Sequence, residues 1–128
     1  MKKLTELVAR GLLGIMFVMA GIGKTGAGYA GTVAYMDAMG VPGALLPLVI
    51  ALEIIGGVLV IIGFKVEWAA YALAGFSLLA GVIFHANFAD QMQSILFMKN
   101  IAIVGGLMIL AVNGAAGLSV DGYVKRQS

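Results

Sequence analysis

The sequence predicts an all-α fold, an integral membrane four-helix bundle. One reason is composition: the 128 residues are 62% hydrophobic and 11% charged, with a mean hydropathy of +1.06, whereas an ordinary soluble chain is about 45–50% apolar and about 25% charged. The other is that four apolar segments follow one another, each close to the ~20 residues that cross a ~30 Å hydrocarbon core. The alternating pattern of a β-barrel is absent, and the length favours one domain, residues 1–128.

The first expected helix covers about residues 4–23 and is the weakest of the four. Its uninterrupted apolar run starts only at Gly11, so Arg10 and Lys24 must lie near the interfaces or face protein. The two lysines at the N-terminus resemble the start of a signal peptide. Arg10, however, stands where the apolar core of such a peptide would begin, and we therefore expect a retained membrane helix.

The other three expected helices cover about residues 43–64, 68–88 and 97–116. Pro47 falls in the first turn of the second helix, where proline is tolerated because that turn has no helical partner for a backbone N–H. Between the first and second helices, residues 24–42 form a long loop. The stretch GTVAYMDAMG within this loop is compatible with a short helix at the membrane interface.

The remaining connections are a tight turn at residues 65–67 and a loop at residues 86–94, and a polar tail follows at residues 117–128. Four spans place both termini on one side of the membrane. With the N-terminus inside, more Lys and Arg residues are cytoplasmic than face outward, which favours an N-in, C-in orientation. The inner residues are Lys2, Lys3, Lys65, Lys125 and Arg126, and the outer ones are Lys24 and Lys99.

Polar and small residues recur together on one face of each expected helix, because residues three or four positions apart share a face. Small residues let membrane helices approach closely, and polar groups avoid lipid by facing the bundle interior. We therefore expect the four faces to meet in a compact bundle with a polar interior. The faces are Arg10, Gly14, Phe17, Gly21 and Lys24; Glu53, Gly56, Gly57 and Val60; Ala70, Ala74, Ser77, Gly81 and His85; and Lys99, Ala102, Gly106, Ile109 and Asn113.

Glu53 is a single carboxylate in the otherwise apolar run VIALEIIGGVLVIIGF. About ten residues into its span, it is expected near the bilayer midplane, where an acid costs on the order of 2.5–3.5 kcal/mol on insertion scales. Such a carboxyl group is neutral unless a cation or several donors stabilise its charge. It either exchanges protons or orients a ligand, or it ties the bundle together as a paired or protonated group.

His85, Lys24, Lys99 and Asn100 are expected near the outer end of the bundle. His85 can exchange protons near neutral pH, or it is only a hydrogen-bonded structural group. Lys99 and Asn100 open the expected fourth helix, where a lysine opposes the helix dipole and so suggests a specific role; snorkelling to the interface is the alternative. One histidine cannot make a zinc site, and we expect no metal. The candidate ligand or proton site is Glu53, His85, Lys24, Lys99, Asn100 and Arg10.

A series of these residues follows a distinctive order over roughly residues 5–122. It consists of Arg10, Gly21 with Lys24, Glu53, Gly63 with Phe64, His85, Lys99 with Asn100, and the G-x-S-x-D motif at Gly117, Ser119 and Asp121. This series resembles the DoxX family of small four-helix membrane proteins. The resemblance implies a multi-pass protein of the bacterial inner membrane, and it is nearest to the branch described as oxidoreductases tied to quinone or catechol stress. Other relatives are named for a subunit of a thiosulfate:quinone oxidoreductase.

Three functions fit this pattern. In the first, a quinone-linked redox accessory or quinone-handling protein, Glu53, His85 and Lys99 hydrogen-bond a quinone and pass protons. The sequence has no cysteine, haem ligand pair or flavin motif, so a membrane or periplasmic redox partner would supply the electrons. The alternatives are a scaffold or assembly factor with a purely structural polar core, and a small transporter module, which would require an oligomer. The few, scattered basic residues argue against nucleic acid as a partner.

Overall fold

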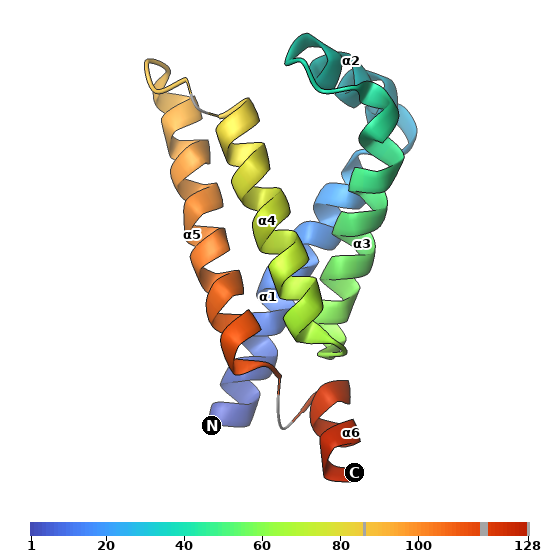
Figure 1. Cartoon of the computed structure of the whole chain (residues 1–128), viewed down its shortest axis with the longest axis vertical. Coiled ribbons are helices and arrows are strands. Elements are labelled where there is room, and N and C mark those ends of the chain that lie inside the picture. The colour runs from blue at the N-terminus through green and yellow to red at the C-terminus, as the bar shows by residue number, and fades with distance from the viewer. Residues whose placement is uncertain (86, 116–117, 128) are drawn as a thin grey trace.

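Four long helices form the body of the molecule, and each is long and apolar enough to cross a membrane (Figure 1). The structure is a computed structural model that describes residues 1–85, 87–115 and 118–127. The described residues form helices and their connections, without strands, which confirms the predicted all-α class. The long helices are α1 (Lys2–Gly23), α3 (Leu46–Ile62), α4 (Val66–Phe84) and α5 (Gln91–Asn113).

Shorter helices lie at the two ends of the bundle. The first loop contains α2 (Tyr29–Ala38), which confirms the short helix expected there, and 3-10 turns at Gly26–Gly28 and Gly43–Leu45 flank it. The C-terminal tail was expected to be polar, and most of it forms a further helix, α6 (Val120–Gln127). Residues 116 and 117, the expected end of the fourth helix and the glycine of the G-x-S-x-D motif, lie outside the described residues.

Both termini lie at one end of the bundle, together with the α3–α4 turn and α6 (Figure 1). We call this the terminal end. The opposite end, which we call the loop end, carries α2 and the connection between α4 and α5 (Figure 1). The common side predicted for the two termini is therefore confirmed, and the N-in, C-in orientation stays a prediction.

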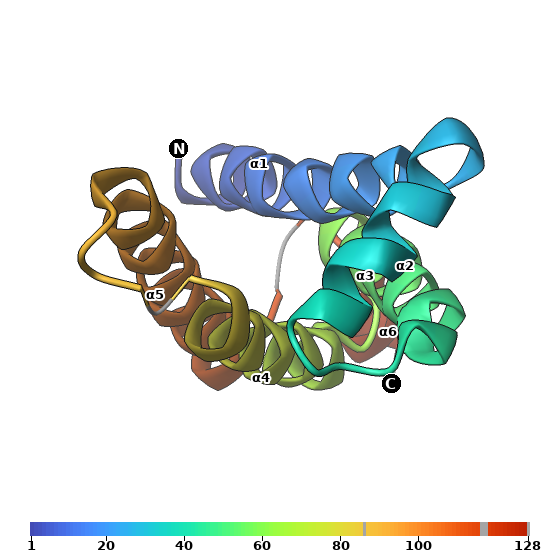
Figure 2. The ribbon, with the colours of Figure 1, turned by 90° about the horizontal axis from the view of Figure 1, so that it is seen from above.

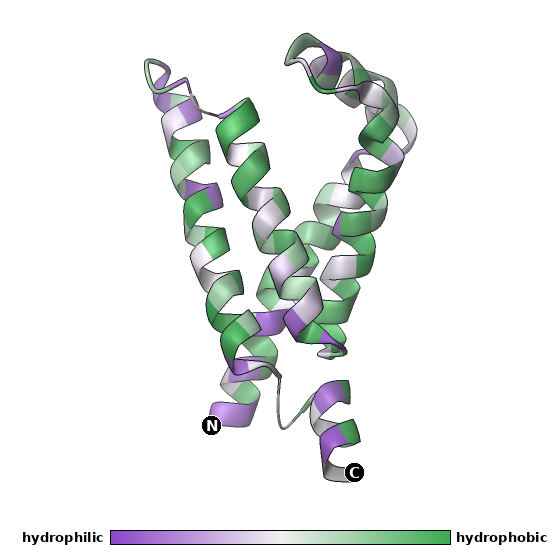
Figure 3. Cartoon of the chain, in the orientation of Figure 1, coloured by the Kyte–Doolittle hydropathy of each residue, from purple (hydrophilic) through white to green (hydrophobic). Residues whose placement is uncertain are grey.

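The outer surface of the long helices is apolar along most of its length (Figure 3). Large side chains such as Leu12, Leu48 and Val112 are 68%, 68% and 77% exposed. In water, so much uncovered apolar surface would drive aggregation. Polar residues gather mainly at the two ends (Figure 3), as in helices that face lipid along their middle and water at their ends.

The α1–α3 contact is close because glycines of the two helices face each other. A Cβ built on Gly14 would lie 2.6 Å from the carbonyl oxygen of Gly57, and one built on Gly57 would lie 2.7 Å from that of Gly14. No side chain fits at either position, so the two backbones touch, as small residues permit in membrane bundles. The predicted faces from Arg10 to Gly21 and from Glu53 to Val60 are buried as expected.

The central core lies where α4 meets α3 and α5. Val60, Leu73 and Leu107 have no exposed surface. The predicted third face is buried here from Ala70 to Gly81, and His85 follows at the end of α4. Small residues on α4 thus allow its neighbours to approach on two sides.

The predicted fourth face is wrong. Lys99, Ala102, Ile109 and Asn113 are exposed, and α5 turns a neighbouring face inward. The contact of α5 with α4 is made by larger apolar side chains, so a stripe of small residues does not mark the contact face. Membrane helices also carry such side chains on the faces that contact lipid, and the sequence alone therefore does not distinguish the two faces. The inward residues are Asn100, Ile103, Val104, Leu107 and Ala111.

The start of α5 lies earlier than predicted, at Gln91 rather than residue 97. Asp90 is the N-cap, and its Oδ1 accepts a hydrogen bond from the backbone N–H of Met92 at 2.9 Å. The first turn is polar, so hydropathy alone does not detect it. Lys99 and Asn100 consequently lie about two turns inside the helix rather than at its start, and the helix-dipole argument for Lys99 no longer applies.

The C-terminal segment caps α4 from a distance in sequence. Asp121 Oδ1 and Oδ2 accept hydrogen bonds from the backbone N–H groups of Lys65 and Val66, at 2.7 and 3.0 Å. The Asp121 N–H donates to the Gly63 carbonyl at 2.8 Å. Lys65 adopts a left-handed backbone conformation, with φ of 48°, that is uncommon for residues other than glycine. The aspartate of the G-x-S-x-D motif therefore holds the α3–α4 turn in its conformation.

The long helices form two pairs, α1 with α3 and α4 with α5, and α3 and α4 join the pairs. The pairs come together at the terminal end and separate toward the loop end (Figures 1 and 2). The bundle is therefore less compact than the sequence predicts. Three of the four predicted faces are buried, and a cavity lies between the pairs.

Candidate functional site

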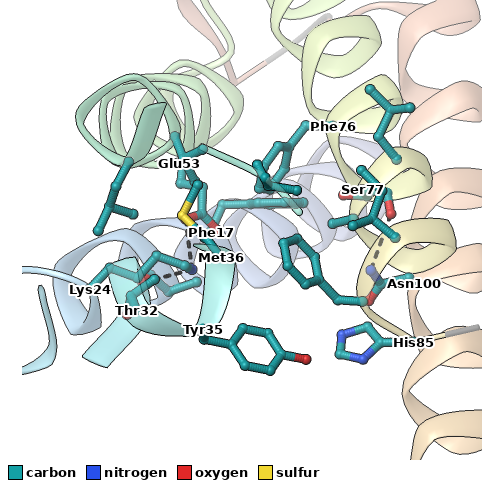
Figure 4. Close-up of a pocket in the computed structure, with 18 of the residues that line it drawn as sticks. Phe17, Lys24, Thr32, Tyr35, Met36, Glu53, Phe76, Ser77, His85 and Asn100 are labelled. Carbon is teal, nitrogen blue, oxygen red and sulfur yellow. Dashed lines mark hydrogen bonds and ion pairs between the residues drawn. The ribbon is translucent and has the colours of Figure 1, made fainter. Parts of the chain in front are cut away.

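A cavity of about 440 Å³ lies between the two helix pairs, and α1 to α5 all contribute to its walls (Figure 4). Most of its lining is apolar and includes Phe17, Met36 and Phe76. Polar groups occur at a few positions on opposite walls (Figure 4). They are Lys24, Thr32, Tyr35, Glu53, Ser77, His85, Lys99 and Asn100.

An ion pair between Lys24 and Glu53 forms the polar part of the α1–α3 wall. Lys24 Nζ lies 2.8 Å from Glu53 Oε1 and donates a hydrogen bond to the Ala20 carbonyl at 3.3 Å. Gly21 gives the pair its space, since a Cβ there would lie 3.3 Å from Glu53 Cβ and 2.6 Å from a side-chain carbon of Ile54. Lys24 follows the C-terminus of α1, where the helix dipole also favours a cation.

Glu53 is almost enclosed, with its side chain 4% exposed against 28% for Lys24. Its Oε1 takes part in the ion pair with Lys24, and no further donor among the described residues bonds this oxygen. Buried polar atoms in proteins are normally hydrogen-bonded. A carboxylate oxygen with unused accepting capacity therefore lies in the wall of the cavity.

His85 lies on the opposite wall, at the end of α4. Its Nδ1 is 2.8 Å from Oε1 of Gln93 in the first turn of α5. With the Gln93 amide oxygen facing the ring, Nδ1 is the donor of this bond, and the role of Nε2 depends on the protonation of the ring. The early start of α5 at Gln91 is what brings Gln93 within reach.

Asn100 and Lys99 reach the cavity from α5. Asn100 Nδ2 donates to the Ser77 carbonyl at 3.1 Å. Gly81 leaves room for this contact, because a Cβ there would lie 3.3 Å from Asn100 Cβ. Lys99 lines the rim of the cavity and is otherwise exposed.

The short helix α2 lies over the loop end of the bundle on the α3 side (Figure 2). Its residues Thr32, Tyr35 and Met36 line the cavity, and Met36 is buried. The ring of Tyr35 stacks on Phe84 of α4, with centroids 5.3 Å apart and an interplanar angle of 26°. The stacked rings join α2 to α4 across the mouth of the cavity.

Arg10 lies apart from the cavity, near the terminal end. It is 1% exposed. Its guanidinium donates to the carbonyls of Val60, Ile61 and Leu118, and its Nε lies 3.3 Å from Glu6 Oε1. Arg10 thus holds α1 to the end of α3 and to the C-terminal segment, which is a structural role.

The structure therefore brings five predicted site residues to one cavity and separates Arg10 from them. Sequence reasoning missed Gln93 and the α2 residues, because both lie in segments expected to be loops. The spacing of Thr32, Tyr35 and Met36 on one face of a short helix was the available signal. In the described part of the chain, no three His, Cys, Asp or Glu side chains converge as a metal site requires.

Comparison with known proteins decides the family. The family model of DoxX matches residues 5–86, from α1 to the end of α4. The chain belongs to the DoxX family. The matched part of this DoxX protein includes Lys24, Glu53 and His85, whereas α5 lies beyond it.

Two Escherichia coli K12 proteins extend the similarity of this DoxX protein into α5. It is 48% identical to inner membrane protein YqjF over 130 aligned residues, which cover 99% of each chain. It is 31% identical to inner membrane protein YphA over 122 residues, 90% of this chain and 86% of that one. No solved structure matches it. With its four spanning helices, this DoxX protein is an integral, multi-pass protein of the inner membrane.

Proposed function

We propose that this protein binds a quinone in the cavity between its helix pairs, as a quinone-handling protein or an accessory to quinone-linked redox chemistry. The observation that carries the proposal is an apolar cavity of about 440 Å³ with polar groups on two opposite walls (Figure 4). Small-molecule sites are typically ~300–1,000 Å³ and mainly apolar, with a few placed polar groups. The position of the cavity among membrane-spanning helices favours a ligand that dissolves in lipid.

A quinone ring matches this cavity in shape and polarity. The ring is flat and apolar on its faces, which suits contact with Phe17 and Phe76. Its two carbonyl oxygens lie on opposite edges and accept hydrogen bonds. Lys24 retains an ammonium proton beyond its contacts with Glu53 and Ala20 and would donate to one oxygen. Asn100, on the other wall, would donate to the second.

Reduction of a quinone to a quinol takes up two electrons and two protons. Glu53 and His85 are the cavity side chains best suited to exchange those protons. A quinol also offers two hydroxyl donors, and Glu53 Oε1, which has accepting capacity beyond its ion pair with Lys24, would accept one. We assign the electrons to a membrane or periplasmic redox partner, since the sequence contains no cysteine.

The test is to extract the protein with its native lipid into polymer-bounded nanodiscs and to measure quinone per chain by mass spectrometry. We expect quinone in excess over discs that hold an unrelated membrane protein. Glu53→Gln keeps the side-chain shape and removes the charge that orients Lys24, so we expect about a tenfold loss of bound quinone. Glu67→Gln, at an exposed position on α4, is the matched control and should change nothing. The proposal would be contradicted if wild-type discs contained no more quinone than the discs with the unrelated protein. It would also be contradicted if the wild type and Glu53→Gln contained equal amounts of quinone per chain.

A scaffold or assembly role is the second candidate, and a specific observation favours it. Arg10 and the Lys24–Glu53 pair both tie helices together, as expected of a polar core that serves only the fold. In that case Glu53→Gln lowers thermal stability while quinone content and partner function at equal protein level stay unchanged. Quinone content and melting temperature measured on the same nanodisc samples together separate the two candidates, because only the proposed function predicts a loss of quinone.

A further inference from the structure

The α1 and α5 helices make no extended contact with each other. The two helices come close to each other in the half of the bundle toward the terminal end. There the tip of the Leu13 side chain is 4.0 Å from the position of a Cβ built on Gly106. Beyond this point the two helices separate toward the loop end (Figures 1 and 2). Met16 and Ala20 of α1 and Ile103 of α5 line the cavity. The cavity therefore reaches the α1–α5 side of the bundle, where these two helices make no extended contact, and we call this side the slot.

Packing contacts hold several neighbouring helices together around the rest of the cavity. The glycine contact seals α1 against α3, and Gly81 brings α4 against Asn100 of α5. The stacked rings of Tyr35 and Phe84 join α2 to α4. The slot is a side of the cavity without such a contact, and there the cavity faces the hydrocarbon of the bilayer.

We propose that the ligand of this cavity carries a long hydrocarbon tail, which leaves through the slot into the bilayer while the ring stays between the polar walls. The proposal rests on the proposed function and narrows its ligand to long-chain prenyl quinones. The edges of the slot are apolar, and Ile15 and Met19 beside it are 46% and 60% exposed toward lipid. A tail in the slot therefore stays in apolar surroundings from the ring to the membrane.

The polar groups fix which end of the ligand is inside. Glu53, which is ion-paired to Lys24, and Asn100 lie in the walls of the cavity rather than on the outer surface. An oxygen-bearing ring finds hydrogen-bond partners there, whereas a hydrocarbon chain would leave those groups unsatisfied. A quinone without a tail would occupy the same walls and leave the slot empty, so the two ligand classes respond differently to a change in the slot.

The test compares two quinones with the same ring, one with a long prenyl tail and one with a methyl group in its place. Binding is measured on delipidated protein in nanodiscs of synthetic phosphatidylcholine, after correction for partition into the lipid. We expect the wild type to bind the tailed quinone at least about tenfold more tightly. Ile103 also lines the cavity, so the measured quantity is the ratio of the two affinities, which Ile103→Trp should bring close to one because its ring fills the slot. Ile101→Trp, a lipid-facing change on the same helix, is the control and should alter neither affinity.

Equal affinity of the wild type for the two quinones would overturn the proposal, and so would equal weakening of both by Ile103→Trp. Absence of binding by either quinone would overturn the proposed function as well. These results are distinguishable. If the cavity binds both quinones equally, the proposed function stands and only the proposal about the tail and the slot is wrong.

A reversible bridge across the slot gives a second measurement that does not depend on the folding of the tryptophan variant. The chain has no cysteine, so Met16→Cys and Ile103→Cys can be joined in the folded protein by bis-methanethiosulfonate reagents of graded length. We expect the bridge to stop exchange of the tailed quinone, a reductant to restore it, and exchange of the tailless quinone to continue. Bridges between two chains in place of bridges within one would put a second copy at the slot and overturn the proposal.

Discussion

At the scale of single residues, the buried charges of this protein meet partners on other segments of the chain. Lys24 of the α1 end reaches Glu53 in the middle of α3. Arg10 binds the carbonyls of Val60 and Ile61, which belong to the last turn of α3 and have no intrahelical donor. In hydrocarbon an unsatisfied polar group costs several kcal/mol. Both residues therefore favour a single arrangement of α1 against α3.

The Lys24–Glu53 pair can be tested by a double-mutant cycle with Lys24→Met, Glu53→Gln and the double variant. We expect Lys24→Met to destabilise most, because it leaves an acid that is 4% exposed without its cation. Adding Glu53→Gln should recover part of the loss, with a coupling energy of about 0.5–3 kcal/mol. The free energies of unfolding in detergent micelles provide the cycle, and Lys99→Met at an exposed position is the control. Strictly additive effects would show that the two groups do not interact.

At the scale of helices, glycine decides how closely α1 approaches α3. Gly14→Ala would place a methyl group 2.6 Å from the Gly57 carbonyl oxygen and against the Ile61 side chain. Backbone cannot yield as a side-chain tip can, so we expect α1 to shift and stability to fall by about 1–3 kcal/mol. Gly11→Ala on the same helix meets nothing within 4 Å and should stay within about 0.5 kcal/mol. Thermal unfolding of both variants checks this, and equal losses would show that the contact is not tight.

The same scale shows what can be predicted from the sequence and what cannot. The faces of α1, α3 and α4 are predictable because small residues and isolated polar groups mark them, as Gly57 and Glu53 do. The face of α5 is not, because Ile103 and Leu107 point inward while equally apolar residues point to lipid. Its start at Gln91 escapes detection because the first turn is polar.

For the site, the helical spacing of small and polar residues predicts that Lys24 and Glu53 each lie on the inward face of their own helix. Their pairing then follows from the close packing of α1 on α3. The placement of His85 follows from the length of its helix. The sequence does not show that Tyr35 closes the cavity, because α2 folds back over the bundle through contacts distant in sequence. Nor does it separate Arg10 from the cavity, since depth along α1 can be judged only once the helix ends are known.

At the scale of the whole molecule, the two ends of the bundle differ in charge and in structure. The terminal end carries Lys2, Lys3, Lys65 and Lys125, whereas Lys24 and Lys99 lie toward the loop end with the cavity. From the positive-inside rule we therefore expect the cavity in the outer half of the bilayer. An N-in, C-in chain would exchange electrons or ligand with a partner on the periplasmic side.

Cysteine labelling tests this orientation directly, because the chain has no cysteine of its own. Asn87→Cys lies in the exposed α4–α5 connection at the loop end, and Val124→Cys lies at an exposed position of α6. With the N-terminus inside, a membrane-impermeant maleimide added to intact spheroplasts should label the cysteine at position 87. It should label the cysteine at position 124 only after the spheroplasts are lysed. The opposite pattern would move the cavity to the cytoplasmic half of the bilayer. A periplasmic redox partner would then be excluded, because the loop end, toward which the cavity lies, would no longer face the periplasm.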